Sequence, residues 1–146
     1  MAPSRPDKAR VAAAAWRSIF DFIVATAGER NRAIGELGLT PNDARALSSL
    51  GVKPGRTMGE LAAEWRCDAS TATWIVDRLE NRGLARRRPH PHDRRARLVA
   101  LTPKGARVKQ RQVEGVYLPP RQLLELSLEE LTALRDAAAR LPRGSS

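Results

Sequence analysis

Two short helices separated by a tight turn are the feature that most restricts how this chain can fold. Residues 58–65, MGELAAEW, follow Thr57 and include Glu60, and these two side chains suit a capping box at a helix start. Residues 70–81, STATWIVDRLEN, follow Asp68, which suits the cap of a second helix. Because only three or four residues separate the two helices, the spacing predicts a helix-turn-helix.

The second helix of this pair has one apolar side and one polar side. Four apolar residues recur at helical spacing and predict the buried side: Ala72, Ile75, Val76 and Leu79. The other side is small and polar toward its N-terminal end, where a recognition helix meets base edges. An ordinary surface helix would show the same pattern. The residues we expect to contact DNA from this motif are Arg56, Thr57, Ser70, Thr71, Thr73, Trp74 and Arg78.

A dense basic segment follows the second helix. The net charge is +10, and residues 78–111 hold twelve lysines and arginines against two acids, whereas the rest of the chain holds fourteen of each sign. Such a local excess favours a polyanionic partner over a solvated charged face, which usually mixes signs. Because residues 84–88 and 95–101 look extended and residues 89–93 look like a turn, we expect a β-hairpin.

A basic hairpin directly after a helix-turn-helix is a wing. The arginines of this wing that we expect to face DNA are Arg88, Arg94, Arg95 and Arg97. Asp93 is expected to hold one neighbouring guanidinium in place while the tip of the hairpin reaches into a minor groove.

The segments on either side of this centre are predicted to be helical. Residues 7–37 carry an apolar stripe and no internal proline, with Gly28 as a possible bend, and such a helix would be roughly 45 Å long. Thr40 and the residues after it start a further helix, which runs to about Leu50. Residues 104–141 are helical, apart from an interruption at the two prolines 119–120.

These elements predict a mainly α chain with a small β-hairpin wing. Residues 39–105 would form a winged helix-turn-helix DNA-binding domain, and residues 1–38 and 106–146 a helical dimerisation region. The helix that starts after Ser127 has a second apolar stripe, which, like the stripe on the first helix, calls for a partner surface.

Composition argues against several other classes of protein. A single cysteine, Cys67, excludes an internal disulfide and suits a reducing compartment. We find no signal-peptide pattern and no stretch near the ~18 apolar residues of a membrane span, so we expect no membrane partner. No nucleophile motif or glycine-rich phosphate loop indicates an enzyme. His90, His92 and Asp93 could approach a metal ion, but the adjacent arginines disfavour a cation, so no metal and no cofactor are expected.

The central segment resembles the MarR family of bacterial transcription regulators. The most specific match is Asp93-x-Arg95-x-x-x-Val99-x-Leu101-Thr102-x-x-Gly105, which is similar to the family's wing signature. The segment from Ser70 to Leu84 is similar to the family's recognition helix and its exit. The resemblance implies a cytoplasmic, nucleoid-associated homodimer that binds a palindromic operator on double-stranded DNA. Such a protein usually acts as a repressor and is released by a small aromatic ligand or by oxidation.

The ligand and the mode of DNA binding leave alternatives open. The resemblance points to Trp16, Phe20, Arg45 and Leu47 as lining a ligand site, although core and dimer contacts would explain them as well. Trp74 lies where the family often has a polar or basic residue, and it could pack on sugar and thymine methyl or fold against the protein. Cys67 is expected to be a half-buried apolar filler. The alternatives are an architectural DNA-binding protein without effector and a redox-sensing regulator that uses Cys67.

Overall fold

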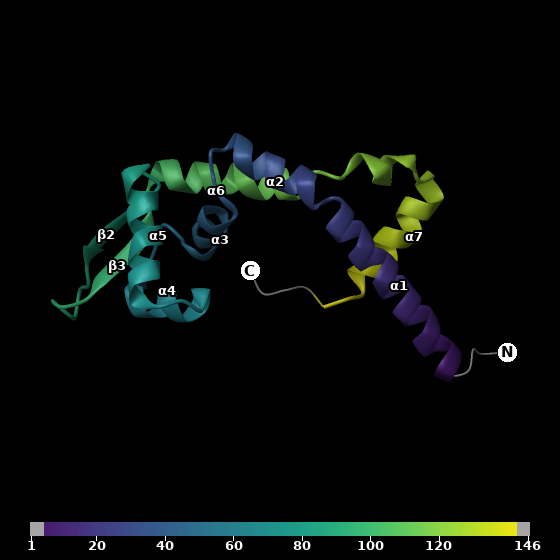
Figure 1. Ribbon diagram of the computed structural model, residues 1–146, viewed down its shortest axis with the longest axis horizontal. Helices are drawn as coiled ribbons and strands as arrows, with labels where there is room; N and C mark the ends of the chain where they lie inside the picture. The colour runs from purple at the N-terminus through teal and green to yellow at the C-terminus, as the bar shows by residue number, and fades with distance from the viewer. Residues whose placement is uncertain (1–4, 143–146) are drawn as a thin grey trace. The chain divides into compact units, whose positions relative to one another are not determined.

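The computed structural model describes residues 5–142 as a mainly helical chain with one small sheet (Figure 1). It divides into two compact units, Met1–Val116 and Tyr117–Ser146. The elements of the first unit are α1 (Arg5–Ala25), α2 (Ala27–Glu36), α3 (Pro41–Ser49), β1 (Arg56–Thr57), α4 (Met58–Trp65), α5 (Ala69–Asn81), β2 (Ala85–Pro89), β3 (Arg97–Leu101) and α6 (Pro103–Val116). The second unit contains the 3-10 helix η1 (Arg121–Glu125) and α7 (Leu128–Ala139).

The winged helix-turn-helix predicted from the sequence is confirmed. Helices α4 and α5 form the pair, and β2 and β3 follow as an antiparallel hairpin that projects beyond α5 in Figure 1. Both predicted caps are present, because Thr57 and Glu60 form a capping box and Asp68 accepts a hydrogen bond from the backbone of Thr71. The turn between the helices contains Arg66, whose left-handed backbone (φ 53°) ends α4.

A third strand, which the sequence analysis did not predict, joins the hairpin. Strand β1 is antiparallel to β3, with Arg56 opposite Val99 and Thr57 opposite Leu98, which gives the sheet order β1-β3-β2. A strand of two residues has no alternation to detect in a sequence. It forms here because β3 offers the unpaired backbone groups of its second edge.

The hydrophobic core lies between the helix-turn-helix, α3 and the base of the sheet. The predicted inner side of α5 is confirmed, since Ala72, Ile75, Val76 and Leu79 are its buried residues. Leu47 of α3 and Leu61 of α4 are fully buried in the same cluster. The core therefore fixes the direction in which the outer side of α5 points.

The first predicted helix is interrupted at Thr26 rather than at Gly28. The buried hydroxyl of Thr26 donates to the carbonyl oxygen of Phe22 at 2.7 Å and accepts from Arg30 at 2.9 Å. A threonine that bonds back to the preceding turn bends a helix, which explains the division into α1 and α2. Gly28 lies inside α2, which begins at Ala27, so the interruption precedes it.

The helical stretch Asp7–Glu36 has the predicted length but is more apolar than the sequence analysis allowed. It spans 30 residues and contains an 18-residue window with a mean hydropathy of 1.3, so by length and composition alone it could cross a membrane. A core helix of a soluble protein and a signal sequence meet the same criteria. The part of the chain described here holds one such helix.

The wing turn is longer than predicted. Strand β3 begins at Arg97 and not at residue 95. Residues 94 and 95 belong instead to a turn that Asp93 closes with Ala96. Its carboxylate accepts the backbone N–H of Arg95 at 2.9 Å, and its carbonyl oxygen accepts that of Ala96 at 3.2 Å. An aspartate that bonds the backbone two residues ahead stabilises such a turn.

Helix α6 is joined to the exit of the recognition helix by a close backbone contact. The Thr102 hydroxyl donates to the carbonyl of Gly83 at 2.6 Å and accepts the N–H of Gly105 at 3.0 Å. Gly83 has a left-handed backbone (φ 68°). This conformation is typical of the residue that follows the end of a helix, here α5. A Cβ atom on Gly105 would overlap the carbonyl oxygen of Leu84, so only glycine fits there.

The second unit contains the predicted helix after Ser127, with its capping box to Glu130. The two prolines 119–120 end the helical run as expected, and η1 follows them. None of the residues of α7 is buried in this chain, and Leu128, at the start of its apolar stripe, is 81% exposed. Residues 1–4 and 143–146, the ends of the predicted dimerisation region, lie outside the described residues.

Gly105→Ala is expected to lower the free energy of unfolding by about 3 kcal/mol, at the upper end of overpacking costs because the obstructing atom is backbone. The measurement is urea unfolding of the full chain. Gly59→Ala is the matched control, since its added methyl would meet no atom within 4 Å, and it should be neutral or slightly stabilising. Equal stability of Gly105→Ala and the unsubstituted protein would contradict the close contact.

Candidate nucleic-acid interface

Helix α5 presents its outer side to solvent. Ser70, Thr71, Thr73 and Trp74, four of the residues predicted to contact DNA, are exposed there. The Asp68 carboxylate accepts the backbone N–H of Thr71 and the hydroxyl of Ser70, each at 2.7 Å. These bonds lower the pKa of Asp68, with the backbone of Thr71 as the main cause. The first turn of α5 is thus held by a carboxylate that stays ionised at neutral pH.

An ion pair links the second half of α5 to the start of α3. The Nε and Nη2 atoms of Arg78 donate to the two carboxylate oxygens of Asp43 at 3.0 and 2.7 Å. Asp43 is 1% exposed and also accepts the backbone N–H of Thr40 at 3.1 Å. The bond from Arg78 lowers the pKa of Asp43 against the opposing effect of burial, and the same bond raises the pKa of Arg78.

Arg78 therefore has an internal partner, and this changes its predicted role. Its side chain is 36% exposed, and the guanidinium carbon lies 4.9 Å from the centre of the Trp74 ring. Because Nε and Nη2 of Arg78 both donate to Asp43, the guanidinium is held against the protein. Arg78 therefore stabilises the outer side of α5 and does not project from it. This pair could not be predicted from the sequence, because an acid at position 43 also suits the first turn of α3.

Three further residues of the predicted set are engaged within the chain. Arg56 forms an ion pair with Glu64, and the side chain of Thr57 accepts the N–H of Glu60 at 3.2 Å. Arg88 donates from Nη2 to the carbonyl oxygens of Val52 and Pro54, at 3.3 and 3.1 Å. The Nε atom of Arg88 is buried without a hydrogen-bond partner among the described residues.

Part of the counter-charge of the arginine cluster lies inside the chain, contrary to expectation. Arg87 on β2 pairs with Asp77 at 2.8 Å and with Glu80, both on α5, and its backbone N–H donates to Glu80 at 2.7 Å. These contacts fasten the wing to the recognition helix. Arg87 was missing from the predicted site, and only the three-residue spacing of the two acids on α5 could have indicated it.

Other cations of the basic segment serve backbone carbonyls. Arg82 donates to Gly38 at 2.6 Å and to Leu37 at 3.0 Å, and Lys109 donates to Leu50 at 2.7 Å. Lysine and arginine side chains commonly satisfy the free carbonyls at the ends of helices. A large part of the basic excess is thus structural.

The tip of the wing keeps the exposed cations. Arg94, Arg95 and Arg97 are exposed, and within residues 5–142 no ion pair engages them. The carboxylate of Asp93 bonds the backbone of Arg95, whereas the sequence analysis expected it to hold a guanidinium. Asp93 therefore shapes the turn, and the three side chains remain free to meet an anion.

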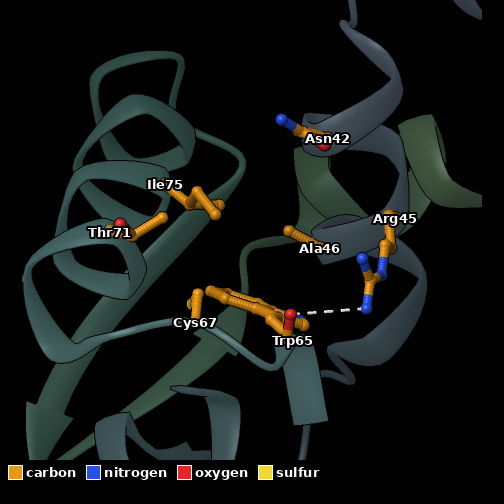
Figure 2. A pocket seen from close by; sticks show the side chains of 7 residues that line it. All are labelled: Asn42, Arg45, Ala46, Trp65, Cys67, Thr71 and Ile75. Carbon is orange, nitrogen blue, oxygen red and sulfur yellow. Dashed lines mark hydrogen bonds between the residues drawn. The ribbon is translucent and has the colours of Figure 1, made fainter. Parts of the chain in front are cut away.

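A small cavity lies beside the N-terminal half of α5 (Figure 2). Its volume is about 170 Å³, and its walls are Asn42, Arg45, Ala46, Trp65, Cys67, Thr71 and Ile75. Arg45 donates to the carbonyl oxygen of Trp65 at 3.4 Å across one side of it. Cys67 is half-buried and packs against the core, as an apolar filler would.

The four residues predicted to bind a ligand are not brought together around this cavity. Arg45 lines it, but Trp16 and Phe20 lie on α1 with their rings 6.1 Å apart, and both are exposed. Leu47 is fully buried in the core, so it is a packing residue in this structure. Among the described residues, no group of three or more histidine, cysteine, aspartate or glutamate side chains could hold a metal ion.

Comparisons with known proteins agree with this geometry. Residues 37–96 match the model of the MarR family. No curated protein matches the chain at a significant level. The chain is similar in fold to the multiple antibiotic-resistance repressor MarR from Listeria monocytogenes, with a TM-score of 0.78 and 20% identity over 91% of this chain and 93% of that chain.

Two further solved structures are similar. The transcriptional regulator Tm0710 from Thermotoga maritima gives a TM-score of 0.71 and 26% identity over 84% of this chain and 87% of that chain. A mutant of MepR from S. aureus, bound to an oligodeoxyribonucleotide, gives a TM-score of 0.71 and 19% identity over 86% and 94% of the two chains.

Asp43→Asn is expected to destabilise the protein by about 2 kcal/mol at pH 7, because it removes charged hydrogen bonds to Arg78. Since the folded pKa of Asp43 lies below its usual value of 3.8, this contribution is complete above that value and is lost as the pH falls through the folded pKa. Urea midpoints at pH 7, 5 and 3 measure it, and the gap between the two proteins should narrow at pH 3.

The control for this experiment is Glu36→Gln, which removes an exposed carboxylate on α2. It should change the urea midpoint little at any pH. A gap between Asp43→Asn and the unsubstituted protein that is as wide at pH 3 as at pH 7 would mean that Asp43 contributes through shape alone.

Proposed function

We propose that this chain, whose residues 37–96 match the model of the MarR family, is a transcriptional regulator of that family and represses transcription as a homodimer on a palindromic operator. The observation that carries the proposal is the pairing of two exposed features on one winged helix. The outer side of α5 offers polar groups and an indole, and the wing tip offers three unpaired arginines. The outer side of α5 suits contacts with base edges in a major groove, and the arginines of the wing tip suit contacts with phosphates and a minor groove.

Base reading is assigned to Ser70, Thr71, Thr73 and Trp74, in two half-sites about one helical turn apart, or ~10 base pairs. The DNA-bound relative, MepR, supports this use of the fold. Arg56, Thr57, Arg78 and Arg88, which are engaged within the chain, are assigned to shaping the interface. The arginines of the wing tip supply the electrostatic part of the affinity.

The second copy of the chain is proposed to cover the apolar surfaces of α1 and α7. On α1, Trp16 is 63% exposed and Phe20 is 51% exposed, and they belong to one stripe with Ile19 and Ile23. An exposed apolar patch of this kind marks an interaction site in a soluble protein. A palindromic operator requires two such winged helices related by a two-fold axis.

Release by a small aromatic ligand rests on the family resemblance. Of the residues predicted for it, Arg45 faces the cavity beside α5, whose volume of about 170 Å³ suits a single benzene-sized ring. A guanidinium there would favour a ring with a carboxylate or a phenolate. The alternatives are an architectural DNA-binding protein without effector, and a redox-sensing regulator in which oxidation of Cys67 would disturb the same turn.

Phe20→Glu is expected to convert the homodimer into a monomer, because it places a charge in the centre of the apolar stripe of α1. Light scattering at micromolar concentration should give about twice 16.1 kDa for the unsubstituted chain and 16.1 kDa for the variant. Ala14→Glu, on the opposite side of α1, is the matched control and should remain dimeric. A monomeric unsubstituted chain would refute the dimer.

Arg95→Ala is expected to weaken operator binding by about 1–3 kcal/mol, to blunt the preference for A·T-rich flanks and to leave thermal stability nearly unchanged. Arg94→Ala should weaken binding to all DNA alike and lower the slope of log affinity against log salt by about 0.9. Fluorescence anisotropy on an operator selected from a random pool measures both. Operator binding by Arg95→Ala that equals the unsubstituted protein would show that the wing is a solvated loop.

The same titrations separate the proposed function from its alternatives. A specific regulator should bind the selected operator at least about a thousandfold more tightly than random DNA of equal length. An architectural protein would bind both alike. Loss of specific binding after oxidation, absent in Cys67→Ser, would favour the redox-sensing regulator.

A further inference from the structure

Trp74 is an apolar residue at the centre of the surface proposed to face DNA. It is 54% exposed and lies on the side of α5 opposite to Ala72, Ile75, Val76 and Leu79. The residues beside it in the preceding turn are small and hydroxyl-bearing. An indole in this place gains nothing from the core, so its surface is available to a partner.

Two of the polar side chains near Trp74 interact with the cap of α5. The hydroxyl of Ser70 donates to Asp68, and the side chain of Thr71 also interacts with that carboxylate. Trp74 is consequently the largest feature on this part of α5 that is free to contact a base.

A chain of contacts fixes the indole from one side. The guanidinium of Arg78 lies over the Trp74 ring at 4.9 Å, and its donors are held by both carboxylate oxygens of Asp43. Asp43 is buried and is itself held by the backbone N–H of Thr40. Because Arg78 cannot rotate without breaking two charged hydrogen bonds, the ring that stacks on it is pre-oriented before DNA arrives.

We propose that Trp74 reads the C5-methyl group of a pyrimidine in the major groove, and that Arg78 is the residue that positions it. This inference rests on the proposed function, which places α5 in that groove. The ring has a single hydrogen-bond donor and cannot make the bidentate contacts that identify guanine or adenine. The thymine methyl is the one apolar group that a base edge presents there, and an apolar side chain is its complement.

The test begins with an operator selected from a random pool by the full-length protein. Each thymine of this duplex is then replaced singly by deoxyuridine, which removes only the C5-methyl group. Loss of one buried methyl should lower the affinity about fourfold at the thymine that Trp74 contacts. Trp74→Ala should bind the thymine and uracil duplexes equally at that position, while the effect of uracil at other positions stays unchanged.

A second substitution of the DNA isolates the methyl group from the identity of the base. At the sensitive position, the T·A pair is replaced by C·G and by 5-methylcytosine·G. The unsubstituted protein should prefer the methylated cytosine over cytosine about fourfold, and Trp74→Ala should bind the two alike.

The positioning role of Arg78 needs a measurement that a purely structural role would not change. Arg78→Lys keeps the positive charge but loses the planar contact with both the carboxylate and the indole. Whatever its affinity for the uracil duplex, this variant should lose most of the preference for thymine over uracil at the sensitive position. Adding Trp74→Ala to Arg78→Lys should then have no further effect on that preference, while thermal melting confirms that the variants are folded.

The outcomes separate this inference from the proposed function. If Trp74→Ala retains the full preference for thymine, the inference is wrong although the operator is real. Equal loss of affinity for thymine and uracil duplexes in Arg78→Lys would likewise overturn the positioning role. If the selection enriches no sequence at all, the proposed sequence-specific function fails, and base reading by Trp74 fails with it.

Discussion

The ion pair between Asp43 and Arg78 is the interaction on which the DNA-facing surface depends. It joins the start of α3 to the second half of α5, and the two residues are 35 positions apart in the chain. Burial alone would raise the pKa of Asp43, but two hydrogen bonds from one guanidinium outweigh it and keep the carboxylate charged. Because Arg78 also lies over the Trp74 ring, the same pair connects the start of α3 to the most exposed large apolar side chain of α5.

The basic segment divides into cations that hold the fold together and cations that remain available. Arg87 fastens the wing to α5 through two acids, and Arg82 and Lys109 satisfy backbone carbonyls. At the wing tip, Arg94 and Arg95 are exposed on a turn that Asp93 closes. Mutual repulsion among so many arginines is reduced near the core by these partners, and a polyanion would relieve the repulsion that remains at the wing tip.

Two close contacts connect this centre to the flanking helices. Thr102 bonds the carbonyl of Gly83 at the exit of α5, and Gly105 allows α6 to lie directly against the backbone of Leu84. Both contacts place the start of α6 directly against the exit of the recognition helix. On α1, the exposed rings of Trp16 and Phe20 belong to the surface that the proposed second copy of the chain would cover.

Local chemistry was sufficient to predict the helices, their caps and the wing. The caps at Thr57, Asp68 and Ser127 depend on residues three positions apart, and the buried side of α5 depends on a 3.6-residue period, so both can be read along the chain. Only the tertiary structure decided which charges are internal. From the sequence alone, Asp43 is an acid in the first turn of a helix and Arg78 is a predicted DNA contact. Their ion pair becomes visible only when α3 and α5 are packed against each other. The same holds for β1 and for the fully buried Leu47, because burial and pairing depend on where the elements meet, and that is settled by the packing of the whole core.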